Sequence, residues 1–231
     1  MRILAFDTST EACAVALFDG ARWMDRTEHA GASHSQRLLP IIRELLAESG
    51  GSLRALDGIA FGAGPGSFTG LRIACGVAQG LAFGTALPLV GVGSLEAIAE
   101  AAYATHGWTR VACAVDARMR EVYFAAYERA EGSWRARVEP SVLAPSEVPL
   151  LEGRWFGAGN GFAAYAALGE RLAGALAERD ETTLPTAIAI GTLALPRLKA
   201  GEGVPARDAA PLYVRHRVAL TAAERNAGQR L

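Results

Sequence analysis

The chain has 231 residues, of which 51% are hydrophobic and 20% charged, and its formal net charge is −1. This length allows one large domain or two lobes of roughly 100 residues each. Every long apolar stretch is interrupted by charges, glycine or proline, which excludes a membrane-spanning helix. The near-zero charge gives no indication that the chain binds nucleic acid by itself, because that usually needs a concentrated basic face.

The three cysteines, Cys13, Cys75 and Cys113, lie far apart, each inside an apolar run. Such spacing predicts buried, reduced thiols rather than disulfides. No signal-peptide pattern follows Met1. We therefore expect a cytoplasmic protein that does not associate with membranes.

Hydrophobic periodicity predicts an alternation of strands and helices. The first part of the chain has the order βββαβαβα, with strands at 2–7, 12–18, 22–28, 56–61 and 87–92 and helices at 35–48, 71–83 and 94–103. A weaker version follows, with strands at 110–116, 121–127, 134–139 and 155–156 and helices at 146–151, 162–178 and 186–199. The pattern predicts an α/β fold of two duplicated βββαβα lobes, 1–105 and 106–231, with a frayed tail from about residue 219.

A glycine-rich run from Gly62 to Gly70 joins the strand at 56–61 to the helix at 71–83. Such a junction exposes backbone N–H groups at a helix N-terminus, which is a natural site for an anion. Neither a Walker A loop nor the dinucleotide fingerprint matches, and the chain's one lysine is Lys199. A tight turn that only positions the helix is the alternative interpretation.

Two aspartates, Asp7 and Asp116, each end the first strand of a predicted lobe. If the lobes face each other, these carboxylates could position a metal-bound phosphate across a cleft. Alternatively, each accepts hydrogen bonds from the turn that follows it. The candidate phosphate and cleft residues are Asp7, Thr8, Gly64, Gly66, Ser67 and Asp116.

Catalytic and metal-binding residues are not predicted. The four histidines have neither i, i+3 nor i, i+4 spacing, and none lies near a cysteine in sequence. Ser67 is not in a Gly-x-Ser-x-Gly elbow and has no evident base.

Gly76, Gly80 and Gly84 recur every four residues as a stripe along the helix at 71–83 and just after it, flanked by alanines. Each glycine costs a helix interior about 1 kcal/mol relative to alanine. The stripe therefore indicates close approach of another backbone, either the chain's own sheet or a partner's helix. The candidate partner-interface residues are Leu38, Ile42, Ala74, Gly76, Val77, Gly80 and Gly84.

Segments 3–10, 34–40, 64–72, 116–123 and 211–215 resemble, in order, those of the TsaB (YeaZ) family. The resemblance implies the actin-like ATPase fold (ASKHA, with ribonuclease H-like lobes). It also implies a subunit needed to form N6-threonylcarbamoyladenosine (t6A) at position 37 of tRNAs that read codons starting with A.

The related enzyme TsaD carries two metal-ligating histidines where this chain has Ser94 and Ile98. Neither side chain can replace imidazole as a ligand, so the resemblance implies a non-catalytic subunit without a cofactor of its own. It implies a heterodimer with TsaD through the helices at 35–48 and 71–83, a ternary complex with TsaE, and a homodimer when TsaD is absent. The ATP or ADP and the metal would belong to TsaD and TsaE, and tRNA would bind through the complex.

Two other functions remain as alternatives. One is a stand-alone ATP-binding enzyme of the actin-like class, which would use Asp7 and Asp116 around Mg-ATP. The other is a peptidase, as older labels of the family suggest, although a nucleophile and metal ligands are not evident.

Overall fold

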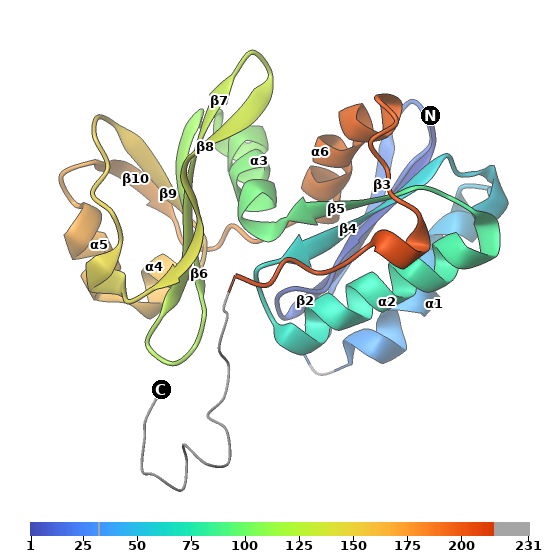
Figure 1. Cartoon of the computed structure of the whole chain (residues 1–231), viewed down its shortest axis with the longest axis horizontal. Helices are drawn as coiled ribbons and strands as arrows, with labels where there is room; N and C mark the ends of the chain where they lie inside the picture. The colour runs from blue at the N-terminus through green and yellow to red at the C-terminus, as the bar shows by residue number, and fades with distance from the viewer. Residues whose placement is uncertain (32, 215–231) are drawn as a thin grey trace, which may run out of the picture.

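The computed structural model describes residues 1–31 and 33–214, and Figure 1 shows two lobes, each built around one β-sheet. The expected tail from residue 219 lies outside the described residues. Each sheet has five strands.

The first sheet has the strand order β3-β2-β1-β4-β5. Its strands are β1 (Ile3–Asp7), β2 (Ala12–Phe18), β3 (Trp23–His29), β4 (Gly58–Gly64) and β5 (Leu89–Gly93). β1 pairs with β2 in antiparallel and with β4 in parallel orientation. The hairpins come from short polar turns such as Asp19-Gly20, whereas the parallel strands need helical crossovers.

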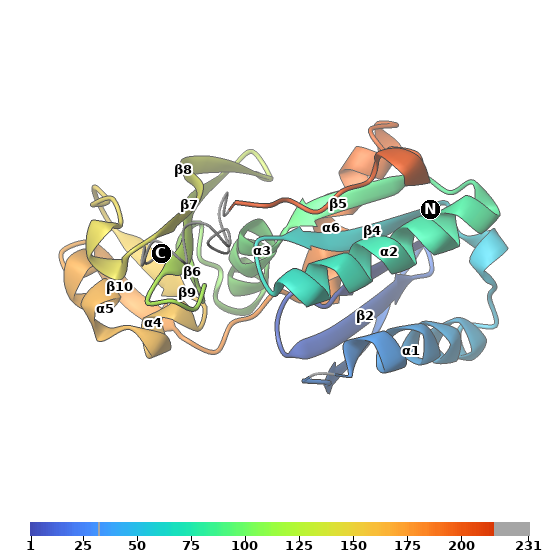
Figure 2. The ribbon, with the colours of Figure 1, turned by 60° about the horizontal axis from the view of Figure 1, so that its bottom comes forward.

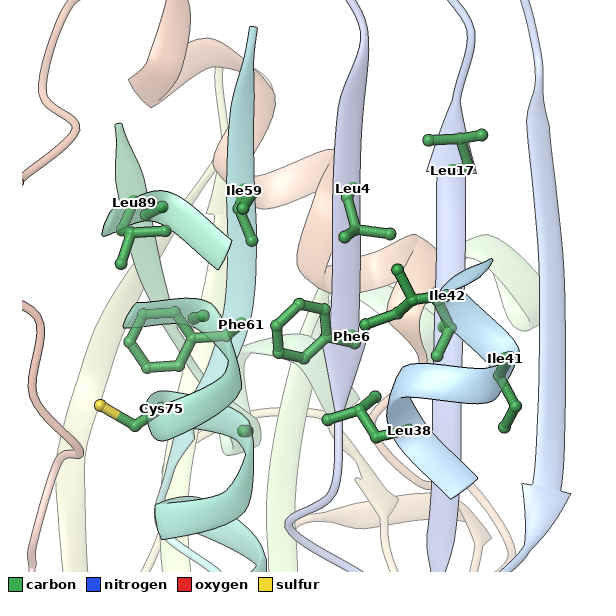
Figure 3. Packing of buried hydrophobic residues seen from close by; sticks show 14 of the residues in the cluster. Leu4, Phe6, Leu17, Leu38, Ile41, Ile42, Ile59, Phe61, Cys75 and Leu89 are labelled. Atoms are coloured by element: carbon green, nitrogen blue, oxygen red, sulfur yellow. The ribbon is translucent and has the colours of Figure 1, made fainter. Parts of the chain in front are cut away.

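Helices cover both faces of this sheet. α1 (His34–Glu48) and α2 (Phe68–Thr85) lie on one face, and α6 (Ala187–Lys199) lies on the other (Figure 2). Side chains alternate along β1, so Leu4 and Phe6 face α1 and α2, as Figure 3 shows, while Ile3 and Ala5 pack on the α6 face. This alternation also determines the face on which the last side chain of β1, Asp7, lies.

The second sheet repeats the arrangement with the order β8-β7-β6-β9-β10. Its strands are β6 (Arg110–Asp116), β7 (Val122–Ala130), β8 (Ser133–Leu143), β9 (Trp155–Ala158) and β10 (Leu176–Asp180). The helices around it are α3 (Ser94–His106), α4 (Gly161–Ala164) and α5 (Ala166–Leu172). Within residues 1–31 and 33–214, short 3-10 turns occur at η1 (Leu53–Ala55), η2 (Pro145–Glu147) and η3 (Ala206–Asp208). The matching strand orders confirm the predicted α/β fold of two duplicated lobes.

Two predicted helices of the second lobe are wrong. The range 162–178 holds α4, α5 and most of β10, because the chain from Leu176 pairs in parallel with β9 instead of continuing a helix. The range 146–151 overlaps only the end of the 3-10 turn η2.

The C-terminal part of the chain returns to the first lobe. α6 was predicted within the second lobe, 106–231, but it packs on β1, β2, β4 and β5. Beyond it, Val204 forms an antiparallel bridge with Leu89, and the Leu212 N–H donates to the Ala63 carbonyl at 2.7 Å. Among the described residues, no helix is long and apolar enough to cross a membrane.

Candidate functional site

A cleft of about 630 Å³ lies where the ends of β1 and β6 approach each other. Its first wall comes from the turn after β1 and the start of α2, and its second wall from the loop after β6 together with Asn160. Residues from both lobes therefore line it: Ser9, Thr10, Glu11, Gly31, His34, Gly66, Ser67, Phe68 and Thr69 from the first, and Val115, Asp116, Ala117, Arg118, Met119, Tyr123 and Asn160 from the second.

Asp7 does not line this cleft. Its side chain is 1% exposed, and its Oδ1 accepts hydrogen bonds from the Ser9 N–H at 2.9 Å and the Ser9 hydroxyl at 2.8 Å. Its Oδ2 lies against Gly62, where any Cβ would overlap it, and has no hydrogen-bond partner among the described residues. Burial raises the pKa of Asp7 to about 6, although the two bonds from Ser9 act in the opposite direction.

The turn after β1 and the glycine run are held together by hydrogen bonds to main-chain carbonyls. The Thr8 hydroxyl donates to the Gly70 carbonyl at 2.7 Å, and the Ser67 N–H donates to the Ser9 carbonyl at 2.8 Å. A Cβ on Gly70 would overlap the Thr8 carbonyl oxygen. The glycines therefore allow the start of α2 to pack directly on the backbone after β1.

The start of α2 opens onto the cleft through Ser67 and Thr69. Ser67 is the N-cap, and its hydroxyl accepts from the Gly70 N–H at 3.3 Å. An anion at this helix terminus remains a prediction.

Asp116 lines the second wall, with its side chain 19% exposed. Its Oδ1 accepts from the Tyr165 hydroxyl and from the Arg118 N–H, both at 2.8 Å, and its Oδ2 lies 3.3 Å from the Arg118 guanidinium. Asn160 fixes the backbone beside it, because the Asp116 N–H donates to its Oδ1 at 3.0 Å. Both aspartates thus accept from the turn that follows them, as the alternative interpretation predicted.

Of the six candidate cleft residues, Gly66, Ser67 and Asp116 line the cleft, whereas Asp7, Thr8 and Gly64 do not. The prediction was wrong for these three residues, each for its own reason. The side-chain alternation along β1 turns Asp7 toward α6. Thr8 turns onto α2, and Gly64 is covered by Leu71 and Leu212.

Ser94 and Ile98 are both fully buried. The Ser94 hydroxyl donates to the Ser9 hydroxyl at 3.2 Å, and Ile98 packs among Leu95, Val111 and other apolar residues of the second lobe. The described residues hold no group of three or more His, Cys, Asp or Glu side chains that could bind a metal ion.

The glycine stripe of α2 faces away from the sheet. Gly76, Gly80 and Gly84 are exposed, and a Cβ at any of them would meet nothing within 4 Å. The alanines beside them contact the sheet instead: Ala74 and Ala78 are 0% exposed. The chain's own sheet is therefore not the neighbour that the stripe approaches.

Three predicted interface residues need correction. Leu38, Ile42 and Ala74 are buried in the core between the helices and the first sheet, so they are unavailable to a partner. An amphipathic helix buries its apolar side against its own sheet, which leaves Leu39 of α1 and Phe83 of α2 exposed by 44% and 88%. Val77 is half-buried.

Sequence reasoning missed an aromatic cluster at the edge of the cleft. Phe68 lies 5.8 Å from Tyr213 between ring centroids, and the Arg72 guanidinium lies 3.9 Å above the Phe68 ring. No sequence signal connects Tyr213 to residues about 140 positions earlier. Asn160, which also lines the cleft, was missed as well.

Comparisons with known proteins bear on the whole chain. The family model of TsaD, tRNA N6-adenosine threonylcarbamoyltransferase, matches residues 27–213. The tRNA threonylcarbamoyladenosine biosynthesis protein TsaB of Escherichia coli K12 is 42% identical over 95% of this chain and 96% of its own length. The TsaB protein of Haemophilus influenzae is 38% identical over 94% and 95%.

Solved structures agree with these relatives. YeaZ from Pseudomonas aeruginosa superimposes with a TM-score of 0.85 at 45% identity, covering 92% of this chain and 99% of that one. A second structure, of an uncharacterized protein with similarity to peptidase YeaZ from the same organism, gives a TM-score of 0.87 at 44% identity, covering 93% and 99%.

Proposed function

The chain belongs to the TsaB (YeaZ) family of tRNA threonylcarbamoyladenosine biosynthesis proteins, and we propose that it acts there as a non-catalytic subunit that binds and supports TsaD. TsaE would join this pair in a ternary complex, and a homodimer would form on the same surface when TsaD is absent. The ATP or ADP and the metal would belong to TsaD and TsaE, and tRNA would be held by the complex.

The observation that carries the TsaD proposal is the outward face of α2. Three glycines there leave the helix backbone bare, and Phe83 is 88% exposed next to them. A glycine stripe without an internal neighbour is unfavourable in an isolated chain. It becomes useful when another helix packs closely against it, since short side chains let the two helix axes approach.

The cleft supports a non-catalytic role over a stand-alone ATPase. A metal-bound phosphate needs ionised oxygens that face it, but the Asp7 carboxyl is buried and its Oδ2 lies against Gly62. Ser94 and Ile98, which stand at the ligand positions of TsaD, are buried in the chain's own packing. We therefore assign the chemistry of threonylcarbamoyl transfer to TsaD.

Reconstitution tests the function directly. TsaD, TsaE and the threonylcarbamoyl-adenylate synthase are mixed with ATP, threonine, bicarbonate and unmodified tRNA, with and without this chain, and t6A is measured by nucleoside chromatography. We expect t6A only when the chain is present. Equal yields without it would contradict the proposal, and ATP hydrolysis by the isolated chain, lost in Asp7→Ala, would favour the stand-alone ATPase.

Gly80→Leu tests where TsaD binds. Because the leucine would project from the glycine stripe, we expect affinity for TsaD to fall by about 1–3 kcal/mol, which is the usual penalty for overpacking a close contact. The measurement is titration calorimetry or gel filtration of the mixed proteins, with the fold checked by circular dichroism. Ala167→Leu, at an exposed site on α5, is the matched control and should bind TsaD normally. Unchanged affinity of Gly80→Leu would refute this placement.

A further inference from the structure

The aromatic cluster at the edge of the cleft, made of Phe68, Arg72 and Tyr213, is here called the aromatic platform. Phe68 and Tyr213 are 47% and 45% exposed. The Arg72 guanidinium lies over the Phe68 ring, and its Nε donates to the Tyr213 hydroxyl at 3.2 Å. The three side chains thus hold one another in place while much of both rings remains open to solvent.

The platform is not needed to anchor the C-terminal segment. Ala209 already accepts a hydrogen bond from the Gln79 side chain at 3.0 Å, and the Leu212 N–H donates to Ala63 at 2.7 Å. Tyr213 comes directly after these contacts and is still 45% exposed. Two partly exposed aromatic rings with a stacked arginine are more typical of a binding surface than of a core.

The orientation of Phe68 suggests where a ligand would lie. Phe68 lines the cleft, whereas Arg72 and Tyr213 do not, and the Arg72 guanidinium covers one face of the Phe68 ring. A flat group entering the cleft would therefore stack on a ring that Arg72 supports from behind. Unpaired nucleobases bind proteins in this way, on aromatic rings and on guanidinium planes.

The rest of the cleft suits a neutral, polar-edged ring better than a phosphate. Asp116 and Glu11 line it, and the arginine that lines it, Arg118, is already 3.3 Å from Asp116. His34, Asn160, Ser67 and Thr69 add hydrogen-bonding groups to the walls. Exposed Arg72 at the platform and exposed Arg120 in the loop after β6 could contact the flanking phosphates of an RNA strand.

We propose that Phe68, Arg72 and Tyr213 form a stacking platform for an unpaired base of an RNA strand, which enters the cleft over the Phe68 ring. This inference rests on the proposed function, because tRNA is the RNA that the complex would present. The inference goes beyond the proposed function because it gives this chain itself a direct contact with the RNA.

The test uses the complex of the full chain with TsaD and an unmodified tRNA transcript, with binding measured by fluorescence anisotropy. Gel filtration first measures whether the wild type and each variant bind TsaD. If the wild type does not bind TsaD, the proposed function fails, and tRNA binding is then measured by anisotropy on the chain alone. Base stacking on an aromatic side chain corresponds to about a 5- to 150-fold change in affinity. We expect such a loss for Phe68→Ala and for Tyr213→Ala, with binding retained by Phe68→Tyr.

The matched control is Tyr103→Ala. Tyr103 is also partly exposed and also carries a stacked arginine, Arg129 at 4.2 Å, but it does not line the cleft, so its loss should leave tRNA binding unchanged. A transcript containing 4-thiouridine gives a second readout, because photo-crosslinks should map to the peptides with Phe68 or Tyr213.

Three outcomes would overturn the proposal. Wild-type tRNA affinity in both alanine variants would exclude stacking. Reduced TsaD affinity of Phe68→Ala would make the platform part of a protein interface. Competition by adenosine or ATP alone, at concentrations near their own dissociation constants, would show that the cleft takes a free nucleoside rather than a base in RNA.

Discussion

Asp7 and Asp116 end the central strands of two sheets with the same strand order, yet they lie on different faces of those sheets. Asp7 shares a face with Ile3 and Ala5, which α6 covers, whereas Asp116 shares a face with Ala112 and Ala114, which α4 and α5 cover. Because successive side chains of a strand point to opposite faces, a one-residue difference between the two strands places their final aspartates on different faces. One carboxyl is consequently buried and the other lines the cleft.

The difference teaches that a duplicated topology does not duplicate a site. The first lobe buries Asp7 at its strand end, where Oδ2 lies against Gly62. The second lobe leaves Asp116 beside Tyr165, whose hydroxyl donates to it at 2.8 Å. The helices of the two lobes also differ. The long α2 carries the exposed glycine stripe, whereas the short α4 and α5 have no comparable exposed face.

The largest effect should come from filling the space beside Asp7. In Gly62→Ala the new Cβ would overlap Asp7 Oδ2 and lie 3.1 Å from Ile190 Cδ1. We expect the free energy of unfolding to fall by at least about 3 kcal/mol, the upper part of the range for overpacked cores. Chemical denaturation measures it. The double variant Gly62→Ala with Asp7→Ala should recover much of the loss, and a loss in the single variant below about 1 kcal/mol would contradict the close contact.

The second prediction concerns the charge of Asp7. Its pKa is raised from 3.8 to about 6 in the folded chain, so the folded state prefers the neutral carboxyl. This stabilisation is present below pH 3.8 and is lost as the pH rises through about 6. Relative to Asp7→Asn, the free energy of unfolding of the wild type should therefore fall by up to about 3 kcal/mol across that interval.

Urea titrations of both proteins at a series of pH values measure this difference. Asparagine keeps the oxygen that accepts from Ser9 and removes only the titrating group, so contributions of other residues cancel. A difference that stays constant with pH would mean that Asp7 is not desolvated by folding.

A smaller effect is expected at the other strand end. Asp116→Ala removes the acceptor of the Tyr165 hydroxyl and of the Arg118 N–H, but the site is open enough for water to replace it. The free energy of unfolding should fall by about 1 kcal/mol, the net value of an ordinary hydrogen bond. Thermal or urea unfolding of Asp116→Ala, Tyr165→Phe and the double variant forms a cycle. Fully additive effects would show that the two side chains do not interact.

Much of the fold could be predicted from the sequence, because most elements are bounded by local signals. The apolar run before Asp19-Gly20 gave β2 its correct limits, and the run that ends at Asp116 did the same for β6. The range 162–178 failed because its helix-forming residues are overridden by strand pairing between β10 and β9. Such pairing depends on residues distant in sequence.

The candidate site was harder to predict than the fold. Of the candidate residues, the structure places Gly66, Ser67 and Asp116 on the cleft wall, since strand ends and helix starts meet there. The sequence could not indicate that Asp7 faces Gly62, because that depends on which face α6 covers. Leu38 and Ile42 were assigned to a partner although their helical spacing equally fits burial on the chain's own sheet, where the structure has them.

The smallest predicted effect compares helix glycines of the two lobes. Gly76→Ala adds a methyl group in open space, whereas Gly169→Ala on α5 places it against the Arg179 guanidinium. Alanine is favoured over glycine in a helix interior by about 1 kcal/mol. We therefore expect Gly76→Ala to raise the free energy of unfolding by up to that amount, and Gly169→Ala to gain less because Arg179 must move.

Urea denaturation measures the free energy of unfolding of both variants, and titration calorimetry measures their affinity for TsaD. If the stripe is kept for a partner, Gly76→Ala should be more stable alone and bind TsaD more weakly, while Gly169→Ala should bind it as the wild type does. A destabilised Gly76→Ala would mean that the stripe already has a neighbour within the chain. A stabilised Gly76→Ala variant with unchanged TsaD affinity would show that the glycine stripe does not serve the heterodimer. The unfavourable glycines of α2 would then be explained neither by the isolated fold nor by TsaD binding.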